Sequence, residues 1–281
     1  MKLFTKICLI VAAIAGGIGI LAIILGLAMG ADAEDLSSVG IYVSPHQQLD
    51  VSGVITEVVE ESTHIYNDTG SKHHHNITDS FSGMKRLEVD VQNAQIIILS
   101  KEDSNDIIYY CDGKRNIAKV EGTTLRLKDE TNIKNKIYLE IHVPVGVLKE
   151  IEIEAMNGTL TVDRLVADNV SIEIDNASVQ IEELVVTNKA ELQINAGQMV
   201  VGYYSGEGLE TECAMGSIMV VCEGKPDDYN FELECGIGNV RVGENNYSGI
   251  GNDFKINNKS PKYINAECGM GEIILEFPNN L

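Results

Sequence analysis

The sequence contains no tryptophan, and aromatic residues make up only 5% of its 281 positions. Aromatic platforms that stack on sugars or bases are therefore not expected. Basic residues are also scarce: 21 lysines and arginines stand against 42 acidic residues, a formal net charge of −21. Because phosphate binding needs clustered positive charge, this balance argues against nucleic acid as a partner. It also argues against a folded domain lying on anionic lipid.

Catalytic motifs are missing as well. The chain has no Gly-x-Ser-x-Gly, no His-Glu-x-x-His, no phosphate-binding loop followed by lysine, and no Cys-x-x-Cys pair. His142 lies in an alternating segment, Tyr138–Val143, without a catalytic partner nearby in sequence, and we interpret it as structural. The sequence therefore predicts a protein that is not an enzyme, with no catalytic, cofactor-binding or metal-binding residues.

An apolar segment is present at the N-terminus. Lys2 and Lys6 precede an uncharged stretch from Ile7 to Ala31, and acidic residues begin at Asp32. About 20 apolar residues cross a bilayer, so residues 1–32 are predicted to be a retained single-pass membrane anchor. The positive-inside rule places the N-terminus in the cytoplasm and the C-terminal domain outside the cell membrane. The alternative is a cleaved signal peptide, since Ala31-Asp32-Ala33 has a small-x-small form.

Residues 33–83 are polar and irregular, and we interpret them as a linker, with Val51–Val59 as a candidate strand. The segment holds five of the six histidines: His46, His64, His73, His74 and His75. Consecutive imidazoles cannot all converge on one ion, and no cysteine lies nearby to complete a tetrahedral set. A solvated loop is therefore favoured over a metal site.

Residues 84–281 repeat themselves. A small residue at a predicted turn recurs at Ala94, Gly158, Ala177, Gly197, Gly216, Gly238 and Gly271. Spacings after Gly158 are 19, 20, 19, 22 and 33, the last containing an insertion at about 244–261. The longer interval from Ala94 to Gly158 leaves room for about three further coils of similar size.

Apolar and polar residues alternate on both sides of this turn. The column three residues before it holds Val91, Ala155, Ile174, Ile194, Cys213, Cys235 and Cys268. A period of two indicates strands with one buried face. Recurrence every coil favours an all-β fold, a right-handed parallel β-solenoid in which successive coils of about 20 residues stack. A β-sandwich is the alternative. Residues before Leu87 and the terminal Phe277-Pro278-Asn279 are the expected end caps.

Cysteines fill part of the inward column, which favours buried thiols that pack as small hydrophobic side chains. A disulfide between Cys213 and Cys235 is the alternative if their coils are neighbours. Cys111 and Cys222 have no evident partner in the sequence.

Two outward columns are acidic. We call the column six residues before the turn the first acidic row: Glu88, Glu152, Ser171, Glu191, Glu210, Glu232 and Asn265. The second acidic row, four before the turn, is Asp90, Glu154, Glu173, Gln193, Glu212, Glu234 and Glu267. Stacked like charges repel. Either salt screens a solvated face, or Ca²⁺ or a basic partner docks there. No calcium-loop motif accompanies the rows, so no cofactor is predicted beyond this Ca²⁺ alternative.

Several short motifs carry a family resemblance. They are the opening strand Leu87–Ala94, the strand exit Ile141–Gly146, the turn Asn157-Gly158, and the turns Gly236-Ile237-Gly238 and Gly269-Met270-Gly271. With these, residues 84–277 resemble the bacterial "putative adhesin" family of β-strand-repeat proteins, a domain of unknown function. The resemblance implies a solenoid-like β fold, often behind one membrane span, and a role in adhesion or envelope signalling. It supplies no site residues.

The predicted function is that of a membrane-anchored extracytoplasmic protein presenting an acidic β-solenoid for adhesion or cell-surface interaction. Two alternatives stay open at this point. One is an envelope-stress or signalling accessory that docks a membrane regulator, and the other is a structural envelope component. The expected partners are the membrane, through the N-terminal helix, and an unidentified surface ligand.

Overall fold

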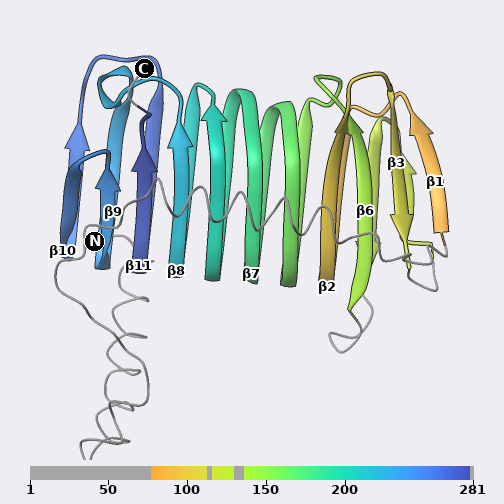
Figure 1. Cartoon of the computed structure of the whole chain (residues 1–281), viewed down its shortest axis with the longest axis horizontal. Helices are drawn as coiled ribbons and strands as arrows, with labels where there is room; N and C mark the ends of the chain where they lie inside the picture. The colour runs from red at the N-terminus through yellow and green to blue at the C-terminus, as the bar shows by residue number, and fades with distance from the viewer. Residues whose placement is uncertain (1–76, 113–115, 130–135, 279–281) are drawn as a thin grey trace, which may run out of the picture. The chain divides into compact units, whose positions relative to one another are not determined.

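The computed structural model describes residues 77–112, 116–129 and 136–278, and the fold in these ranges is all-β. The strands are β1 (Ile77–Ser82), β2 (Arg86–Lys101), β3 (Asp106–Cys111), β4 (Ala118–Glu121), β5 (Thr124–Asp129), β6 (Ile137–Pro144), β7 (Glu150–Ser205), β8 (Gly208–Cys222), β9 (Asn230–Val242), β10 (Asn245–Ile256) and β11 (Tyr263–Glu276). A short 3-10 turn, Pro226–Asp228, precedes β9. All these strands join one 11-stranded sheet (Figure 1).

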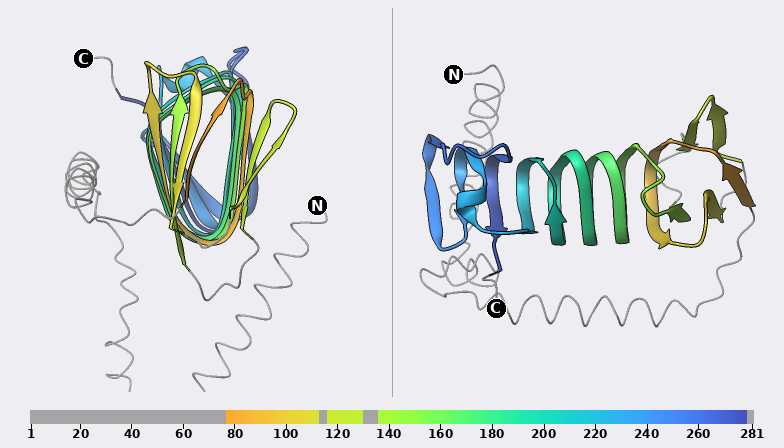
Figure 2. Two further views of the ribbon diagram at one scale, coloured as in Figure 1. Left: turned by 90° about the vertical axis from the view of Figure 1, so that its right-hand side faces the viewer. Right: turned by 90° about the horizontal axis from the view of Figure 1, so that it is seen from above.

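The central strands pair in parallel. β2 pairs with the start of β7, the end of β7 pairs with β8, and β11 pairs with both β8 and β9. β7 spans 56 residues and turns back on itself repeatedly, so its segments lie side by side in the stack (Figure 1). Seen from the end, the chain encloses an elongated core (Figure 2).

The turn column predicted from the sequence is present in the register. Ala94 lies opposite Gly158, Gly197 opposite Gly216, and Gly216 opposite Gly271. The backbones approach so closely here that a Cβ on Gly216 would lie 2.0 Å from the carbonyl oxygen of Gly197. Gly216 also has φ +137°, a conformation that L side chains rarely adopt. The stacked turns therefore require glycine for two separate reasons.

The inward columns form the core. In β9 and β11 every second residue is buried up to the turn, and the alternation resumes after it in β9. The column that holds Val91, Ile174 and Ile194 is at most 1% exposed at these positions. Burial of like side chains from neighbouring strands supplies the main stabilisation of such a stack. The period-two interpretation of the sequence is thus confirmed.

The prediction of an all-β fold is confirmed, but the sheet is mixed and not purely parallel. β1 and β6 both pair antiparallel with β3, β4 with β5, and β10 with β9. The segment between Ala94 and Gly158 does not form the three coils that its length suggested. β5 and β6 instead pair in parallel with the two halves of β2 and make one layer, and β3 adds to β6 in the opposite direction.

The order of strands also departs from the order of the chain. β11 lies between β8 and β9, so the last strand separates two strands that precede it. The insertion at about 244–261 contains the whole of β10, which pairs with the outer side of β9 and covers that end of the stack. The terminal residues are therefore not the main cap. Phe277 packs beside Tyr229 and Phe231, with ring centroids 5.7 and 6.3 Å away.

At the other end, β1 pairs with β3 along its whole length. Residues 77–82, which the sequence analysis assigns to the linker, therefore belong to the sheet. The predicted membrane anchor, the candidate strand Val51–Val59 and the histidine-rich segment lie outside the described residues. Within the described ranges, no helix has the length and apolar character needed to cross a bilayer.

Candidate binding surface

The two acidic rows lie on the outer surface of the parallel strands, in the register that the sequence predicts. Glu88 faces Glu152, and Asp90 faces Glu154, across β2 and β7. At the other end, the pairs are Glu212 with Glu267 and Glu267 with Glu234. Carboxylates in neighbouring strands are thus about 5 Å apart at the backbone, close enough to repel unless neutralised.

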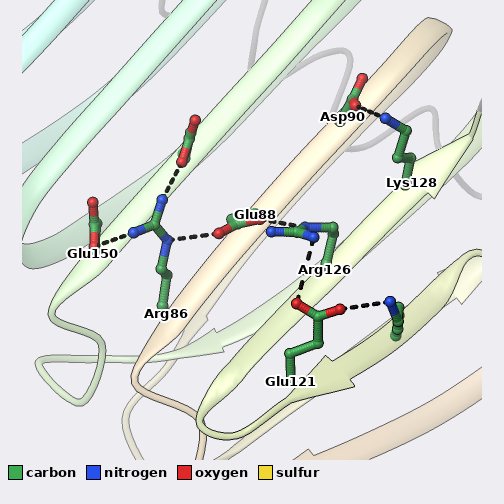
Figure 3. A network of polar contacts seen from close by, with 9 residues as sticks. Arg86, Glu88, Asp90, Glu121, Arg126, Lys128 and Glu150 are labelled. Atoms are coloured by element: carbon green, nitrogen blue, oxygen red, sulfur yellow. Dashed lines mark hydrogen bonds and ion pairs between the residues drawn. The ribbon is translucent and has the colours of Figure 1, made fainter.

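Cations neutralise much of the first acidic row. The Arg86 guanidinium lies 2.8 Å from Glu88, 2.7 Å from Glu150 and 2.5 Å from Glu152 (Figure 3). Arg126 adds a further ion pair to Glu88. The strands place Arg86 two residues before Glu88, on the same outward face, so that one side chain spans two strands.

The same pattern recurs further along the stack. Lys189 pairs with Glu191 and lies 3.5 Å from Glu210, and Lys255 of β10 lies 2.7 Å from Glu232. Lys189 stands two residues before Glu191 on the same outward face, and Lys255 lies on β10, the strand that pairs with β9. The first acidic row is therefore largely a set of ion pairs and contributes little uncompensated charge.

The second acidic row is different. Asp90 at one end lies 2.8 Å from the ammonium group of Lys128. Among the described residues, no lysine or arginine forms an ion pair with Glu154, Glu173 or Glu212. Partial burial, reinforced by the neighbouring Glu152, Asp90 and Glu173, raises the pKa of Glu154. Burial and Glu173 raise the pKa of Glu212 in the same way. Glu154 and Glu212 therefore hold their negative charge at an energetic cost that a bound cation would relieve.

Two shallow hollows lie over this part of the surface. One, of about 250 Å³, is lined by Asp90, Val91, Glu154, Ala155, Met156, Glu173 and Asp175. The other, of about 220 Å³, is lined by Glu88, Val89, Asp90, Arg126, Lys128, Glu152 and Glu154. The two hollows share Asp90 and Glu154 in their linings. The charged residues of the first are all acidic, whereas the second also contains Arg126 and Lys128.

An apolar row follows the edge of the turn at the C-terminal end of the stack. Met215, Met270 and Ile237, each one residue before a turn glycine, are 56%, 42% and 53% exposed. β11 places Met270 beside Met215, and its register with β9 brings Ile237 to its other side. We call these three residues the apolar ridge. Its signal in the sequence is the column one residue before the turn, which holds Met215, Ile237 and Met270.

The second acidic row and the apolar ridge differ in the groups that they attract. Carboxylates without cation partners attract ammonium or guanidinium groups, and the apolar ridge offers contact area to an apolar side chain. No group of three or more His, Cys, Asp or Glu side chains within the described ranges is arranged to hold a metal ion. Calcium binding by the acidic rows stays a prediction.

His142 belongs to a small polar cluster on β6. Its Nε2 lies 2.7 Å from Glu140 Oε1, and the Tyr138 hydroxyl donates to Glu140 Oε2 at 3.0 Å. The ring also lies beside Tyr110, with centroids 5.1 Å apart. Every partner comes from β6 or the neighbouring β3, and these contacts hold the outer face of the two strands together.

The cysteines take the places predicted for them inside the core. Cys111, Cys213, Cys222, Cys235 and Cys268 are all buried thiols. The alternative Cys213–Cys235 disulfide is wrong for this arrangement, because β11 separates the two strands and brings Cys268 between them. Sequence order alone could not reveal this, since the repeats themselves do not encode which coils are neighbours.

Comparison with known proteins gives weak structural neighbours. A putative cell adhesion protein from Clostridium sporogenes aligns over 72% of this chain and 99% of its own, at 11% identity and a TM-score of 0.39. Putative adhesins from Parabacteroides distasonis and Parabacteroides merdae align over 72% of this chain and 96% of their own, at 12% and 14% identity and TM-scores of 0.37 and 0.35. No protein-family model and no curated protein matches the chain. Similarity at this level does not transfer those proteins' roles to this one.

Proposed function

We propose that this protein is a non-enzymatic, membrane-anchored extracytoplasmic protein that presents an acidic β-solenoid for adhesion or another cell-surface interaction. The observation that carries the proposal is the second acidic row, in which Glu154, Glu173 and Glu212 lie on the outer surface without cation partners among the described residues. The raised pKa values of Glu154 and Glu212 mean that their negative charge is disfavoured in the fold, which favours a partner that brings positive charge.

The solenoid is the scaffold in this proposal. Its coils are β2, β7, β8, β11 and β9, wound right-handed, and the antiparallel strands β1, β3 and β10 close its ends. Parallel pairing in register supports this assignment, because each coil then repeats the same outward columns at the strand spacing of about 4.8 Å. A regular row of this kind meets an extended or repetitive partner at several points at once, which raises avidity.

The partner class follows from the surface chemistry. A basic segment satisfies the second acidic row, and apolar side chains in the same segment cover the apolar ridge. A purely anionic partner, such as nucleic acid or anionic lipid, is disfavoured by a net charge of −21. We therefore propose a protein or peptide partner that is both basic and apolar.

The test compares two variants of the full chain displayed on cells. In the first, Glu154, Glu173 and Glu212 are replaced by glutamine. In the matched control, Asp103, Asp227 and Glu244, three exposed acidic residues outside the rows, become Asn, Asn and Gln. Both variants lose three negative charges. Cells are captured on beads carrying an amphipathic Lys/Leu peptide or a neutral Gly/Ser peptide, and surface display is checked with a C-terminal tag.

We expect the row variant to lose most of the capture on Lys/Leu beads, while the control keeps it. Equal losses in both variants would mean that only bulk charge matters, and no loss in either would reject the row as the binding surface. Protease shaving of intact cells tests the topology separately. Cleavage from outside, with the tag otherwise in the membrane fraction, supports the anchor, whereas protection in intact cells rejects an extracytoplasmic domain.

A further inference from the structure

Three buried thiols lie in register on three adjacent strands. β11 aligns Cys268 with Cys213 of β8 on one side and with Cys235 of β9 on the other. The three side chains are 0–3% exposed, and none of them forms a disulfide. No other inward column of the stack brings cysteines together in this way within the described residues.

Strand spacing decides which of these thiols can bond. Adjacent strands lie about 4.8 Å apart, and the Cα atoms of a disulfide are usually about 4.4–6.8 Å apart. Cys268 is therefore within bonding range of both neighbours. Cys213 and Cys235 lie two strands apart, at about 10 Å, which is beyond the roughly 7 Å limit. Only one disulfide can exist at a time, and Cys268 is always part of it.

The surroundings of the thiols distinguish the two pairings. Hydrogen bonding between the thiols of Cys213 and Cys268 lowers the pKa of Cys213 and raises the pKa of Cys268. On the other side, the sulfur of Cys268 packs directly against Gly238 of β9, because a Cβ on Gly238 would lie only 2.8 Å from it. The sulfur of Cys268 thus lies between the two neighbouring strands, with Cys213 of β8 on one side and the backbone of β9 on the other.

We propose that Cys213, Cys268 and Cys235 form a redox site in which Cys268 makes one reversible disulfide, with Cys213 in the resting arrangement and with Cys235 after exchange. The oxidant is a low-molecular-weight disulfide, RSSR. The Cys213 thiolate attacks RSSR and releases one RS⁻, and the Cys268 thiolate then attacks the Cys213 sulfur and releases the second. The two protons lost by the cysteines leave as two RSH, so two thiols are oxidised and one RSSR is reduced.

Exchange within the site needs no further oxidant. The Cys235 thiolate attacks the Cys268 sulfur of the Cys213–Cys268 bond, and Cys213 leaves as a thiolate that takes up the proton. The bond then joins β11 to β9 instead of β8. Either bond ties the last strand of the chain to its neighbour, so oxidation holds β11 in place between β8 and β9. Because the thiols are buried, RSSR reaches them when β11 opens locally.

The experiment uses the full chain, first reduced and then treated with oxidised glutathione under native conditions, with disulfides mapped by mass spectrometry of non-reduced digests. We expect a Cys213–Cys268 linked peptide in the wild type. Cys213→Ser should move the link to Cys235–Cys268, Cys235→Ser should keep Cys213–Cys268, and Cys268→Ser should abolish all links among the three strands. Cys111→Ser and Cys222→Ser are matched controls that change none of this.

A Cys213–Cys235 link in the wild type, glutathione adducts without a linked peptide, or no oxidation of the folded chain would each overturn the proposal. The clamp itself is tested by denaturant unfolding. The oxidised wild type should unfold at higher denaturant than the reduced form, and reductant should reverse the shift. Cys268→Ser should show no shift, and a wild type without one would reject the clamp. None of these readouts depends on adhesion, so the redox site and the proposed function can fail separately.

Discussion

The two ends of the parallel stack share a backbone but differ in chemistry at the same positions. In β2 and β7, the residue before the turn is asparagine at Asn93, Asn157 and Asn176, whereas β8, β11 and β9 carry the apolar ridge there. The inward column changes as well. It holds Val91, Ala155 and Ile174 at one end, and Cys213, Cys268 and Cys235 at the other.

Ion pairs follow the same division. At the β2 end, Glu88 joins Arg86 to Arg126, and Lys128 pairs with Asp90 beside them (Figure 3). At the far end, Lys255 forms an ion pair with Glu232, and the Lys255 side chain is 68% exposed. The comparison teaches that turn glycines and inward apolar columns fix the backbone, while the outward and edge columns are free to diverge. Properties that differ between the ends are therefore where specific function is expected.

The largest expected loss of stability comes from replacing the turn glycines, which both ends of the stack share. Gly158→Val and Gly271→Val each place a Cβ within about 2 Å of the carbonyl oxygen of the facing strand, at φ near +140°. Strain and overpacking together should cost about 3 kcal/mol or more of the free energy of unfolding. Circular dichroism melts should show both variants unfolded or strongly destabilised to a similar degree.

The control for this prediction is Gly146→Ala. Gly146 also has a positive φ, +66°, but open space surrounds the position of its Cβ. It should cost only about 1 kcal/mol. If Gly158→Val melted like Gly146→Ala, close approach of the coils would not be what requires glycine at the turn.

The second prediction compares how much the ion pairs at the two ends contribute to the free energy of unfolding. Arg86→Met removes the cation that contacts Glu88, Glu150 and Glu152, leaving three carboxylates close together, and should cost about 1–2 kcal/mol. Lys255→Met at the other end should cost no more than about 0.5 kcal/mol, because its ion pair is exposed. Urea unfolding at low salt measures both, and high salt should reduce the difference. Equal costs would contradict the division into two ends.

Much of the central stack could be predicted from the sequence because its columns obey simple periodicity. The turn glycines, the inward apolar columns and the two acidic rows all follow from alternation and from a repeat of nearly constant length. The structure reproduces the register of Ala94 with Gly158 and of Gly197 with Gly216.

What the sequence could not supply is the order of the parallel strands in the sheet and the ion-pair partners of the acidic residues. The repeats are so alike that nothing local distinguishes β9 from β11 as the neighbour of β8, and long-range pairing decides it. The ion pairs of Arg86 and Lys189 could not be predicted from the two acidic rows, which contain neither residue. Both residues lie eight before the turn, the next outward position on the same face.

The third prediction concerns pH. The pKa values of Glu154 and Glu212 are raised in the folded state, so folding favours the protonated forms of these two carboxyl groups. The free energy of unfolding therefore falls as the pH rises from the ordinary carboxyl pKa through each raised pKa. Glu154→Gln and Glu212→Gln should therefore increase the free energy of unfolding by about 0.5 kcal/mol at pH 7. The gain should vanish in acid, where the wild-type carboxyls are already protonated. Glu191→Gln, which loses its ion pair with Lys189, should not be stabilised at pH 7.

The smallest effect on stability should come from the apolar ridge, and this prediction sharpens the comparison most directly. Met215, Met270 and Ile237 are about half exposed, so replacing all three by asparagine should change the free energy of unfolding by less than about 0.5 kcal/mol. Capture of displaying cells on Lys/Leu beads should nevertheless fall. The reciprocal variant, Asn157→Met with Asn176→Met, gives the β7 end the same edge chemistry and should raise capture. If neither variant altered capture while the acidic-row variant did, charge alone would account for binding, and the difference between the two edges would have no part in it.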